Sequence, residues 1–332
     1  MDLSSLLDLC GLHSTPGDED EVVSFLLRCW RQHGLTPEVY GRYAVATRIS
    51  GASPSAPTVL ICAHADSPGY VVQRVLSDRR RAVAVALGGA TWDADELPTQ
   101  EAVVKTASGS GLCFLNQSLL ERQAVEVFAN IDVARGDRIC FRPKARIRGS
   151  RVQASFLDNR IGCFLLTHLA GALSTPAVNV VLAATASEEF GGFGAAVLAS
   201  RVQADLVICL DATYADKKQD VRLGGGPVLT LSDASVLVGR PVWNVLERLS
   251  QAWELPLQTE IYNSSGTDAR AFPAQGSLAP VLPLLIASEG NHSPQETAAI
   301  SDLETLAAWL TQLCGDSAAV AELIAAGVFG EA

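Results

Sequence analysis

Apolar residues recur at helical spacing through residues 3–10 and again through 22–34, and each run predicts an amphipathic helix. Between these runs, Thr15-Pro16 followed by Asp18 is typical of a helix cap with a proline and an acidic residue in the first turn. Short apolar runs at 44–49 and 59–62 then predict strands. The opening of the chain therefore predicts both helices and strands.

From about residue 71 to 148 the pattern changes to short apolar runs separated by turns, and no helical spacing fills this stretch. The predicted strands are 82–87, 102–106, 112–115, 124–128 and 138–141. Such a pattern is typical of a small all-β unit, a partly closed barrel or a sandwich. Because α/β patterns flank it on both sides, we interpret 72–149 as a domain inserted into a larger one made of 1–71 and 150–332.

Helices and strands alternate again after residue 150. Strands are predicted at 178–184, 206–210 and 281–286, and helices at 161–173, 194–200, 242–253, 301–314 and 318–329. These strands are apolar almost throughout, as in a sheet that helices cover on both faces. The predicted fold class is α/β, with an inserted small all-β domain.

Composition narrows the class of protein. With 332 residues, 48% hydrophobic and 18% charged, the chain can bury a sizeable core. Its net charge of −11 argues against nucleic-acid binding, which needs a basic face. No apolar stretch is long enough to span a bilayer, no signal-peptide pattern opens the sequence, and the eight cysteines include no C-x-x-C pair. We therefore expect a cytoplasmic protein without nucleic-acid or membrane partners.

Side chains that can bind metal stand just beyond predicted strands or at predicted helix starts, where ligand sites of α/β sheets usually form. Five stretches carry them: His64 with Asp66, Asp158, Glu188 with Glu189, Asp211, and His292. Taken alone, each has an ordinary alternative, such as a polar turn, a helix cap, a solvated acidic pair or a structural histidine. Ser293 and Glu296 form a capping box that predicts a helix directly after His292.

Two features favour a metal site over these alternatives. Glu188 and Glu189 are like charges at the mouth of a buried strand, and the glycines that follow them indicate a tight turn. Apolar neighbours bury the position of Asp158, and a buried carboxylate needs a cation. Histidine and carboxylate without thiolate suit Zn²⁺, Mn²⁺ or Co²⁺. If two ions shared one carboxylate, one of the adjacent glutamates would remain as a general base.

In order and surroundings, these stretches resemble the M42 family of cytoplasmic metallo-aminopeptidases, which is related to the M28 and M20 peptidases. The resemblance covers nearly the whole chain and rests on the stretch 6–22, His64 with Asp66, Asp158-Asn159-Arg160-Ile161-Gly162, Glu188-Glu189, Asp211, Gly266-Thr267-Asp268-Ala269, and His292-Ser293-Pro294 with Glu296. It implies a zinc-exopeptidase-like fold with a mixed central sheet, and the β-rich insertion lies where the family has its smaller domain.

The resemblance also implies a role for each matching residue. Two divalent metal ions, Zn²⁺ first and Co²⁺ or Mn²⁺ as alternatives, would have these ligands: His64 and Asp211 at one ion, Glu189 and His292 at the other, and Asp158 between them. Glu188 would be the general base that activates a metal-bridging water, Asp66 would steady His64, and Asp268 would be structural or substrate-facing. The implied activity is release of N-terminal residues from short peptides. The implied assembly is a homo-oligomer built from dimers through the insertion, up to a dodecamer.

Two stretches depart from the usual residues of the family. Ser67-Pro68-Gly69 stands where members have Glu-Ile-Gly, and Glu289-Gly290-Asn291 where they have Arg-Tyr-Ile. Both adjoin implied ligands, so they bear on substrate choice and assembly. Two alternatives use the same framework: a metal-dependent deacylase of a small N-acyl substrate, and a non-catalytic assembly protein. A glucanase needs two carboxyl groups roughly 5 to 9.5 Å apart across the sugar, which neighbouring glutamates do not provide.

Overall fold

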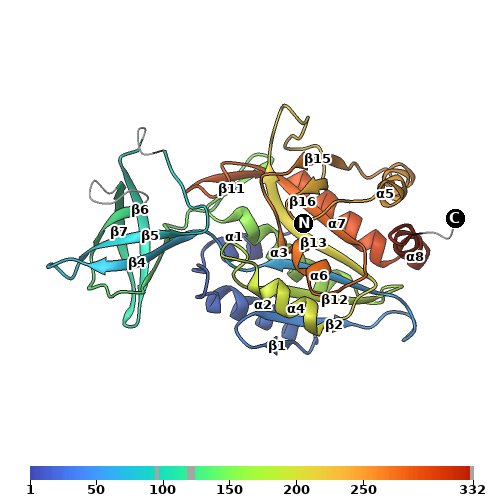
Figure 1. Cartoon of the computed structure of the whole chain (residues 1–332), viewed down its shortest axis with the longest axis horizontal. Coiled ribbons are helices and arrows are strands. Elements are labelled where there is room, and N and C mark those ends of the chain that lie inside the picture. Colours follow the sequence, from blue (N-terminus) through green and yellow to red (C-terminus); the bar gives the residue numbers. More distant parts are fainter. Residues whose placement is uncertain (94–96, 118–123, 330–332) are drawn as a thin grey trace.

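The computed structural model describes residues 1–93, 97–117 and 124–329, and these residues form a large mixed sheet with its helices and a closed barrel beside it (Figure 1). The main sheet contains, in spatial order, β1 (Glu38–Tyr40), β2 (Ala44–Ile49), β12 (Asn179–Thr185), β3 (Thr58–His64), β13 (Leu206–Tyr214), β16 (Val281–Glu289), β17 (Glu296–Ala299), β11 (Arg151–Ala154) and β10 (Arg146–Arg148). β14 (Val228–Asp233) pairs with β16 and with β15 (Gln258–Tyr262).

Four central strands of this sheet, β12, β3, β13 and β16, run parallel to one another. Antiparallel pairs then extend the sheet through β2 on one side and β17 on the other. Because parallel strands end at the same edge, the residues that follow them come together there. The mixed central sheet is therefore confirmed, and its parallel centre decides where polar loop residues meet.

Helices cover both faces of the sheet, which explains why its central strands are apolar on both sides. Val59 and Ile61 of β3 pack into the larger core with helices on one face, whereas Leu60 and Cys62 pack into a separate core on the other. The helices are α1 (Ser4–Cys10), α2 (Asp20–Gln32), α3 (Leu157–Ala172), α4 (Phe193–Arg201), α5 (Arg240–Trp253), η1 (Asp268–Arg270), α6 (Ala271–Ala274), α7 (Ile300–Cys314) and α8 (Ser317–Ala326). None of the described helices is long and apolar enough to cross a membrane.

The stretch predicted to be all-β forms a closed barrel, which lies at one end of the molecule (Figure 1). Around the barrel the strands follow the order β4 (Gly69–Val75), β5 (Arg81–Leu87), β8 (Ala124–Ala129), β7 (Gly109–Gln117), β6 (Thr99–Thr106) and β9 (Arg138–Phe141). Alternate residues such as Ala82 and Ala84 fill its interior together with Tyr70 and Phe141. Closure removes the free edges that a small sheet would otherwise expose.

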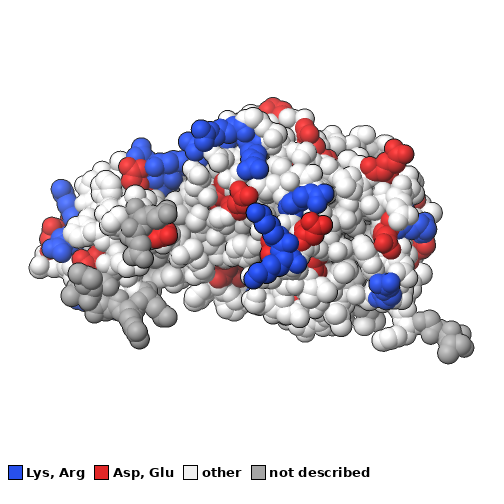
Figure 2. All heavy atoms as spheres, turned by 90° about the horizontal axis from the view of Figure 1, so that it is seen from above, with Lys and Arg blue, Asp and Glu red and all other residues white. Residues whose placement is uncertain are grey.

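The edge strand β10 lies where the main sheet approaches the barrel, and it is strongly basic. Arg146, Ile147 and Arg148 are all exposed, and Figure 2 shows a run of basic side chains in this part of the molecule. Charged residues on an exposed edge strand discourage pairing with another chain. Protection of the sheet edge is therefore enough to explain the basic residues of β10.

The predicted cap of the second helix is wrong. α2 begins at Asp20, and Thr15 instead lies 3.2 Å from the ring of His13 through its hydroxyl. The chain turns at Gly17, whose φ of 81° a right-handed helix cannot contain. Thr15 and Pro16 therefore belong to a turn before the helix.

The helix predicted from the capping box at Ser293 is also wrong. Residues from Glu296 form the strand β17 instead, and the helix α7 starts only at Ile300. The carboxyl group of Glu296 does not turn back to Ser293, because it accepts hydrogen bonds from the backbone N–H groups of Asp158 and His292. The contact of Glu296 with Asp158, which is distant in the sequence, has replaced the predicted local contact with Ser293.

Candidate metal centre

The predicted site residues come together at the carboxyl edge of the parallel strands. β3 ends at His64, and Asp211 lies next to it on β13. Asp158 lies in the first turn of α3, where its backbone is not helical. Glu189 follows β12 and His292 follows β16. The register of the sheet thus gathers residues that are far apart in the sequence.

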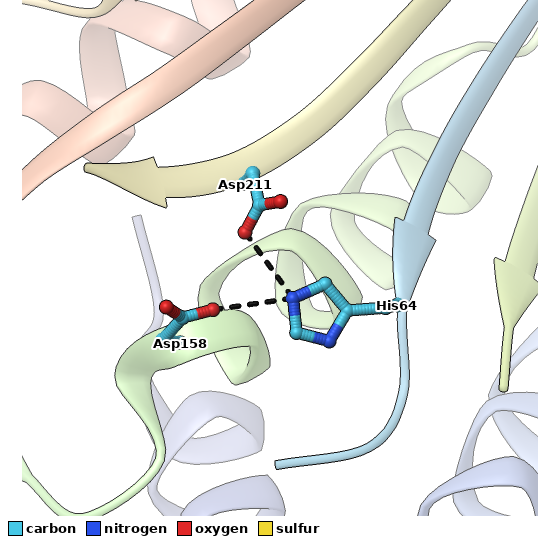
Figure 3. A group of neighbouring side chains, drawn as sticks. All are labelled: His64, Asp158 and Asp211. Atoms are coloured by element: carbon cyan, nitrogen blue, oxygen red, sulfur yellow. Dashed lines mark hydrogen bonds and ion pairs between the residues drawn. The ribbon is translucent and has the colours of Figure 1, made fainter. Parts of the chain in front are cut away.

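His64, Asp158 and Asp211 form the first cluster, which is buried (Figure 3). The Nε2 atom of His64 lies 3.2 Å from Oδ1 of Asp158 and 3.2 Å from Oδ1 of Asp211. Figure 3 shows both carboxyl groups directed at this nitrogen. One imidazole nitrogen and two carboxylate oxygens therefore face a common point.

Asp158, Glu189 and His292 form a second cluster. The Nε2 atom of His292 lies 3.3 Å from Oδ2 of Asp158 and 3.4 Å from Oε1 of Glu189. Asp158 therefore directs one carboxylate oxygen at each histidine. We refer to the first cluster as the His64 set and to the second as the His292 set, with Asp158 common to both.

Divalent cations fit this donor arrangement. Within the described residues, Oδ1 of Asp158 and Oε1 of Glu189 are buried and accept no hydrogen bond, although a histidine nitrogen lies close to each. Buried carboxylate oxygens without hydrogen bonds are costly unless a cation compensates them. Imidazole and carboxylate donors without thiolate suit Zn²⁺, Co²⁺ or Mn²⁺.

Asp66 holds the backbone of the two glutamates. Its carboxylate accepts hydrogen bonds from the N–H groups of Glu188 at 3.0 Å and Glu189 at 3.1 Å. His64 Nδ1 lies 3.1 Å from the backbone carbonyl of Asp66 and 3.6 Å from its carboxylate. The carbonyl oxygen of Asp66 is thus the closer partner of His64, whereas its carboxylate orders the loop that carries Glu188 and Glu189.

Arg160 and Ser67 connect the loop after β3 to the start of α3. Arg160 is completely buried and donates hydrogen bonds to the carbonyl of Ala65 at 2.8 Å and the hydroxyl of Ser67 at 3.0 Å. The Ser67 hydroxyl in turn donates to the carbonyl of Asp158 at 3.1 Å. Ser67 therefore supports the backbone of the shared aspartate.

A cavity of about 260 Å³ opens beside the two clusters and includes residues from both. Glu188 lines it without belonging to either cluster, and its carboxylate lies 3.8 Å from the guanidinium of Arg270. The lining also includes Tyr214, Asp233 and Glu260. Acidic side chains thus dominate the charged lining of the cavity.

A family model described as M42 glutamyl aminopeptidase matches residues 119–308, which is more than half of the chain. The chain belongs to the M42 family. It is therefore a hydrolase of peptide bonds, and the resemblance found in the sequence is confirmed.

Individual relatives agree with this assignment. The M42 chain is 24% identical to the glutamyl aminopeptidase of Lactococcus lactis subsp. cremoris, over 89% of this chain and 90% of that protein. An aminopeptidase relative from Acetivibrio thermocellus is 30% identical, but the match spans only 51% of this chain and 52% of that protein. The solved structure of the Pyrococcus horikoshii TET1 peptidase has a TM-score of 0.82 at 21% identity, with 94% of this chain and 98% of that one covered. That structure shows the shared fold.

Burial is the dominant influence on the acidic groups of the M42 site. It raises the pKa of Glu188 and Glu189 well above the usual range, and that of Asp211 to about 7. Burial would also raise the pKa of Asp158, but its close contacts with the imidazoles of His292 and His64 outweigh burial and lower the pKa. So many buried carboxyl groups in contact resist full ionisation unless cations are present.

Sequence reasoning missed the supporting role of Glu296, although it noticed the residue as part of a capping box. Glu296 is 1% exposed and accepts the N–H groups of Asp158 at 2.9 Å and His292 at 3.1 Å. It also missed Glu260, whose carboxyl group accepts from the hydroxyls of Thr213 and Thr230. Both glutamates lie on strands, β15 and β17, that were not predicted because neither contains a continuous apolar run.

Proposed function

We propose that this M42 protein removes N-terminal residues from short peptides at a site that holds two divalent metal ions. The observation that carries the proposal is the position of Asp158, whose two carboxylate oxygens face two histidines in separate clusters. A carboxylate between two such sets suits a pair of ions that share one ligand. The mixed sheet with ligands at its carboxyl edge also supports a zinc-exopeptidase-like fold.

The proposed ligands of one ion are His64, Asp158 and Asp211, and those of the other are Asp158, Glu189 and His292. Zn²⁺ suits these donors best, with Co²⁺ and Mn²⁺ as alternatives. When bound, such ions polarise the scissile carbonyl and lower the pKa of water.

Glu188 is the proposed general base, because it lines the cavity but belongs to neither ligand set. Its side chain is 10% exposed, so it reaches the cavity while remaining largely shielded from bulk water. It takes a proton from the attacking water and returns it to the leaving amine. Asp66 acts on this step indirectly, because it fixes the Glu188 backbone N–H at 3.0 Å.

The acidic wall of the cavity supports an aminopeptidase rather than a deacylase. Glu260 is 5% exposed, and among the described residues its carboxyl group accepts hydrogen bonds from the neutral hydroxyls of Thr213 and Thr230 and forms no ion pair with a basic side chain. A free peptide amino terminus brings a positive charge into this environment, whereas an N-acyl group brings none. We therefore propose a substrate with a free ammonium group.

We further propose a homo-oligomer built from dimers, in which the inserted barrel forms the contact. The predicted insertion, 72–149, differs slightly from the barrel, whose strands run from Gly69 to Phe141, because β10 (Arg146–Arg148) belongs to the main sheet. Leu112 and Phe114 of β7 are 44% and 47% exposed on the outer side of the barrel. Exposed apolar side chains that alternate along one strand suit a contact with a second copy. The similar TET1 peptidase of P. horikoshii can assemble into a tetrahedron or a large octahedral shell, and its dodecamer has been solved, which supports assembly up to a dodecamer.

The state of the cysteines supports the proposal of a cytoplasmic location. All eight cysteines are free thiols, and seven of them are buried. Unpaired thiols persist most readily in a reducing compartment. The cysteines therefore serve as packing residues.

The proposal is tested by measuring bound metal per chain and hydrolysis of aminoacyl amides with and without a chelator. Glu188→Gln should keep both ions and the fold but lose on the order of 10²-fold or more in turnover, as expected for a removed base. Glu247→Gln, which neutralises an exposed carboxylate outside the cavity, is the matched control. Near-normal turnover of Glu188→Gln would exclude its assignment as the base, and turnover of N-acyl compounds alone would favour the deacylase.

A further inference from the structure

Residues 88–92 leave the barrel at the end of β5 and run to the His292 set; we call this segment the strap. Two residues of the strap, Ala90 and Trp92, contact the barrel. The hydroxyl of Tyr70 donates to the carbonyl of Ala90 at 3.3 Å. The ring of Trp92 packs edge-on against Tyr70 at 6.2 Å and Phe141 at 6.5 Å between centroids, and both of these rings belong to the barrel core.

The other residues of the strap, Gly88, Gly89 and Thr91, lie against two proposed ligands, Glu189 and His292. The N–H of Thr91 donates to the carbonyl of His292 at 3.0 Å. A Cβ atom added to Gly89 would lie 2.6 Å from Nδ1 of His292, and one added to Gly88 would lie 3.1 Å from Cβ and Oε2 of Glu189. The 2.6 Å distance is shorter than real Cβ contacts and the 3.1 Å distance is a tight one, so the strap passes very close to both side chains.

The contact falls on the side of His292 that faces away from the shared aspartate. Nε2 of His292 points at Asp158, while Nδ1 points at Gly89. His292 also has a φ of 64°, which is uncommon for a residue other than glycine and needs support from its surroundings. The ring therefore lies between Asp158 and the strap.

We propose that Gly88 and Gly89 are positioning residues through which the barrel holds Glu189 and His292 in the orientation that binds metal. The barrel would then act on the chemistry of the site as well as on assembly. For each glycine, the three nearest atoms that an added Cβ would meet belong to Glu189 or His292, so the effect is confined to the His292 set. This inference rests on the two-ion site proposed above.

Gly89→Ala is the direct test. Gly88 has a φ of 71°, so a side chain there would also strain the backbone, but Gly89 lies outside the positive-φ range and its alanine variant changes only the Cβ contact. Metal-free protein is titrated with Zn²⁺ by calorimetry, and with Co²⁺ by visible absorption. We expect wild-type binding of one ion and a roughly ten- to a hundredfold weaker binding of the other, as for other changes to groups that orient ligands.

Two further variants make the result decisive. Gly239→Ala is the control, because a Cβ there meets only an ordinary 3.7 Å contact with Pro241. His292→Ala removes the ring, so adding Gly89→Ala to it should change neither the melting temperature nor the binding of the remaining ion. If the alanine still destabilises the protein in that background, Gly89 acts through the fold and the inference is wrong.

The outcomes also separate the inference from the proposed function. Two ions bound by Gly89→Ala with wild-type affinities would overturn the inference alone. Fewer than two ions bound by the wild-type chain would overturn the two-ion proposal and, with it, this inference.

Discussion

The His64 set and the His292 set share Asp158 but differ in how the rest of each is supported. His64 and Asp211 lie on adjacent parallel strands and are 2% and 7% exposed, so the sheet itself fixes their separation. Glu189 and His292 lie on loops beyond the strands, and both are only partly buried. Hydrogen bonds between strands hold His64 and Asp211 in place. Glu189 and His292 are instead held by hydrogen bonds from their backbone N–H groups to the side chains of Asp66 and Glu296.

The loop-borne pair depends on three supports from elsewhere in the chain. Asp66 accepts the N–H of Glu189, Glu296 accepts the N–H of His292, and the strap lies against both side chains. Loops open more readily than strands within a sheet. We therefore expect ions to leave the His292 set before the His64 set, and changes in the supports to act mainly on the His292 set.

Asp158→Asn should have the largest effect, because it removes the one carboxylate that the two sets share. An amide has no negative charge and cannot offer an anionic oxygen to each set. We expect loss of both ions and a fall in turnover at least as large as that for loss of the base, on the order of 10²-fold or more. Metal analysis after gel filtration measures this, and Asp233→Asn should retain both ions. If Asp158→Asn still binds two ions per chain, Asp158 is not shared.

Glu296→Ala should separate the two sets. It leaves the buried N–H groups of Asp158 and His292 without an acceptor, at a cost of roughly 1 to 3 kcal/mol for each. Zn²⁺ binding at the His292 set should weaken by roughly ten- to a hundredfold, with a smaller change at the His64 set. The control is Gln295→Ala, which alters the neighbouring exposed residue. Equal weakening at both sets would contradict the comparison.

The contact between the barrel and the first residues of the chain should respond to pH. Burial alone would lower the pKa of His13, but its interactions with Asp18 and with Cys140 of the barrel together outweigh burial and raise the pKa to about 9. Asp18 also pairs with Lys105 of the barrel strand β6 at 3.1 Å. Loss of the His13 proton should therefore weaken the docking of the barrel, and with it the support that the strap gives to the His292 set.

The sign follows from the folded and unfolded pKa values of His13. Because the folded pKa is raised, the stabilisation is complete below about pH 6.5 and is lost as pH rises through about 9. The whole contribution is on the order of 3 kcal/mol. Denaturant unfolding between pH 6 and 10 measures it, with His13→Gln as the reference that should lack this decline. Parallel curves for the two proteins would show that His13 does not contribute.

Some elements of the fold were not predictable from local pattern. The strands β14 and β15 went unpredicted, because half-buried residues such as Ser232 and Thr259 give them no continuous apolar run. The capping box at Ser293 is a valid local signal, but burial of Glu296 beside Asp158 outweighed it. Local propensities describe what a segment does alone, and these segments are decided by distant partners.

The sequence alone determined the alternation of apolar strands and helices, the all-β character of the insertion, and the residue types of the proposed site, because periodicity and side-chain chemistry are local properties. The tertiary structure decided which of these residues meet. It placed His64 beside Asp211 through sheet register, Glu296 behind Asp158, and the strap against His292. Each of these contacts joins segments far apart in the chain, so only the packed molecule brings them within bonding distance.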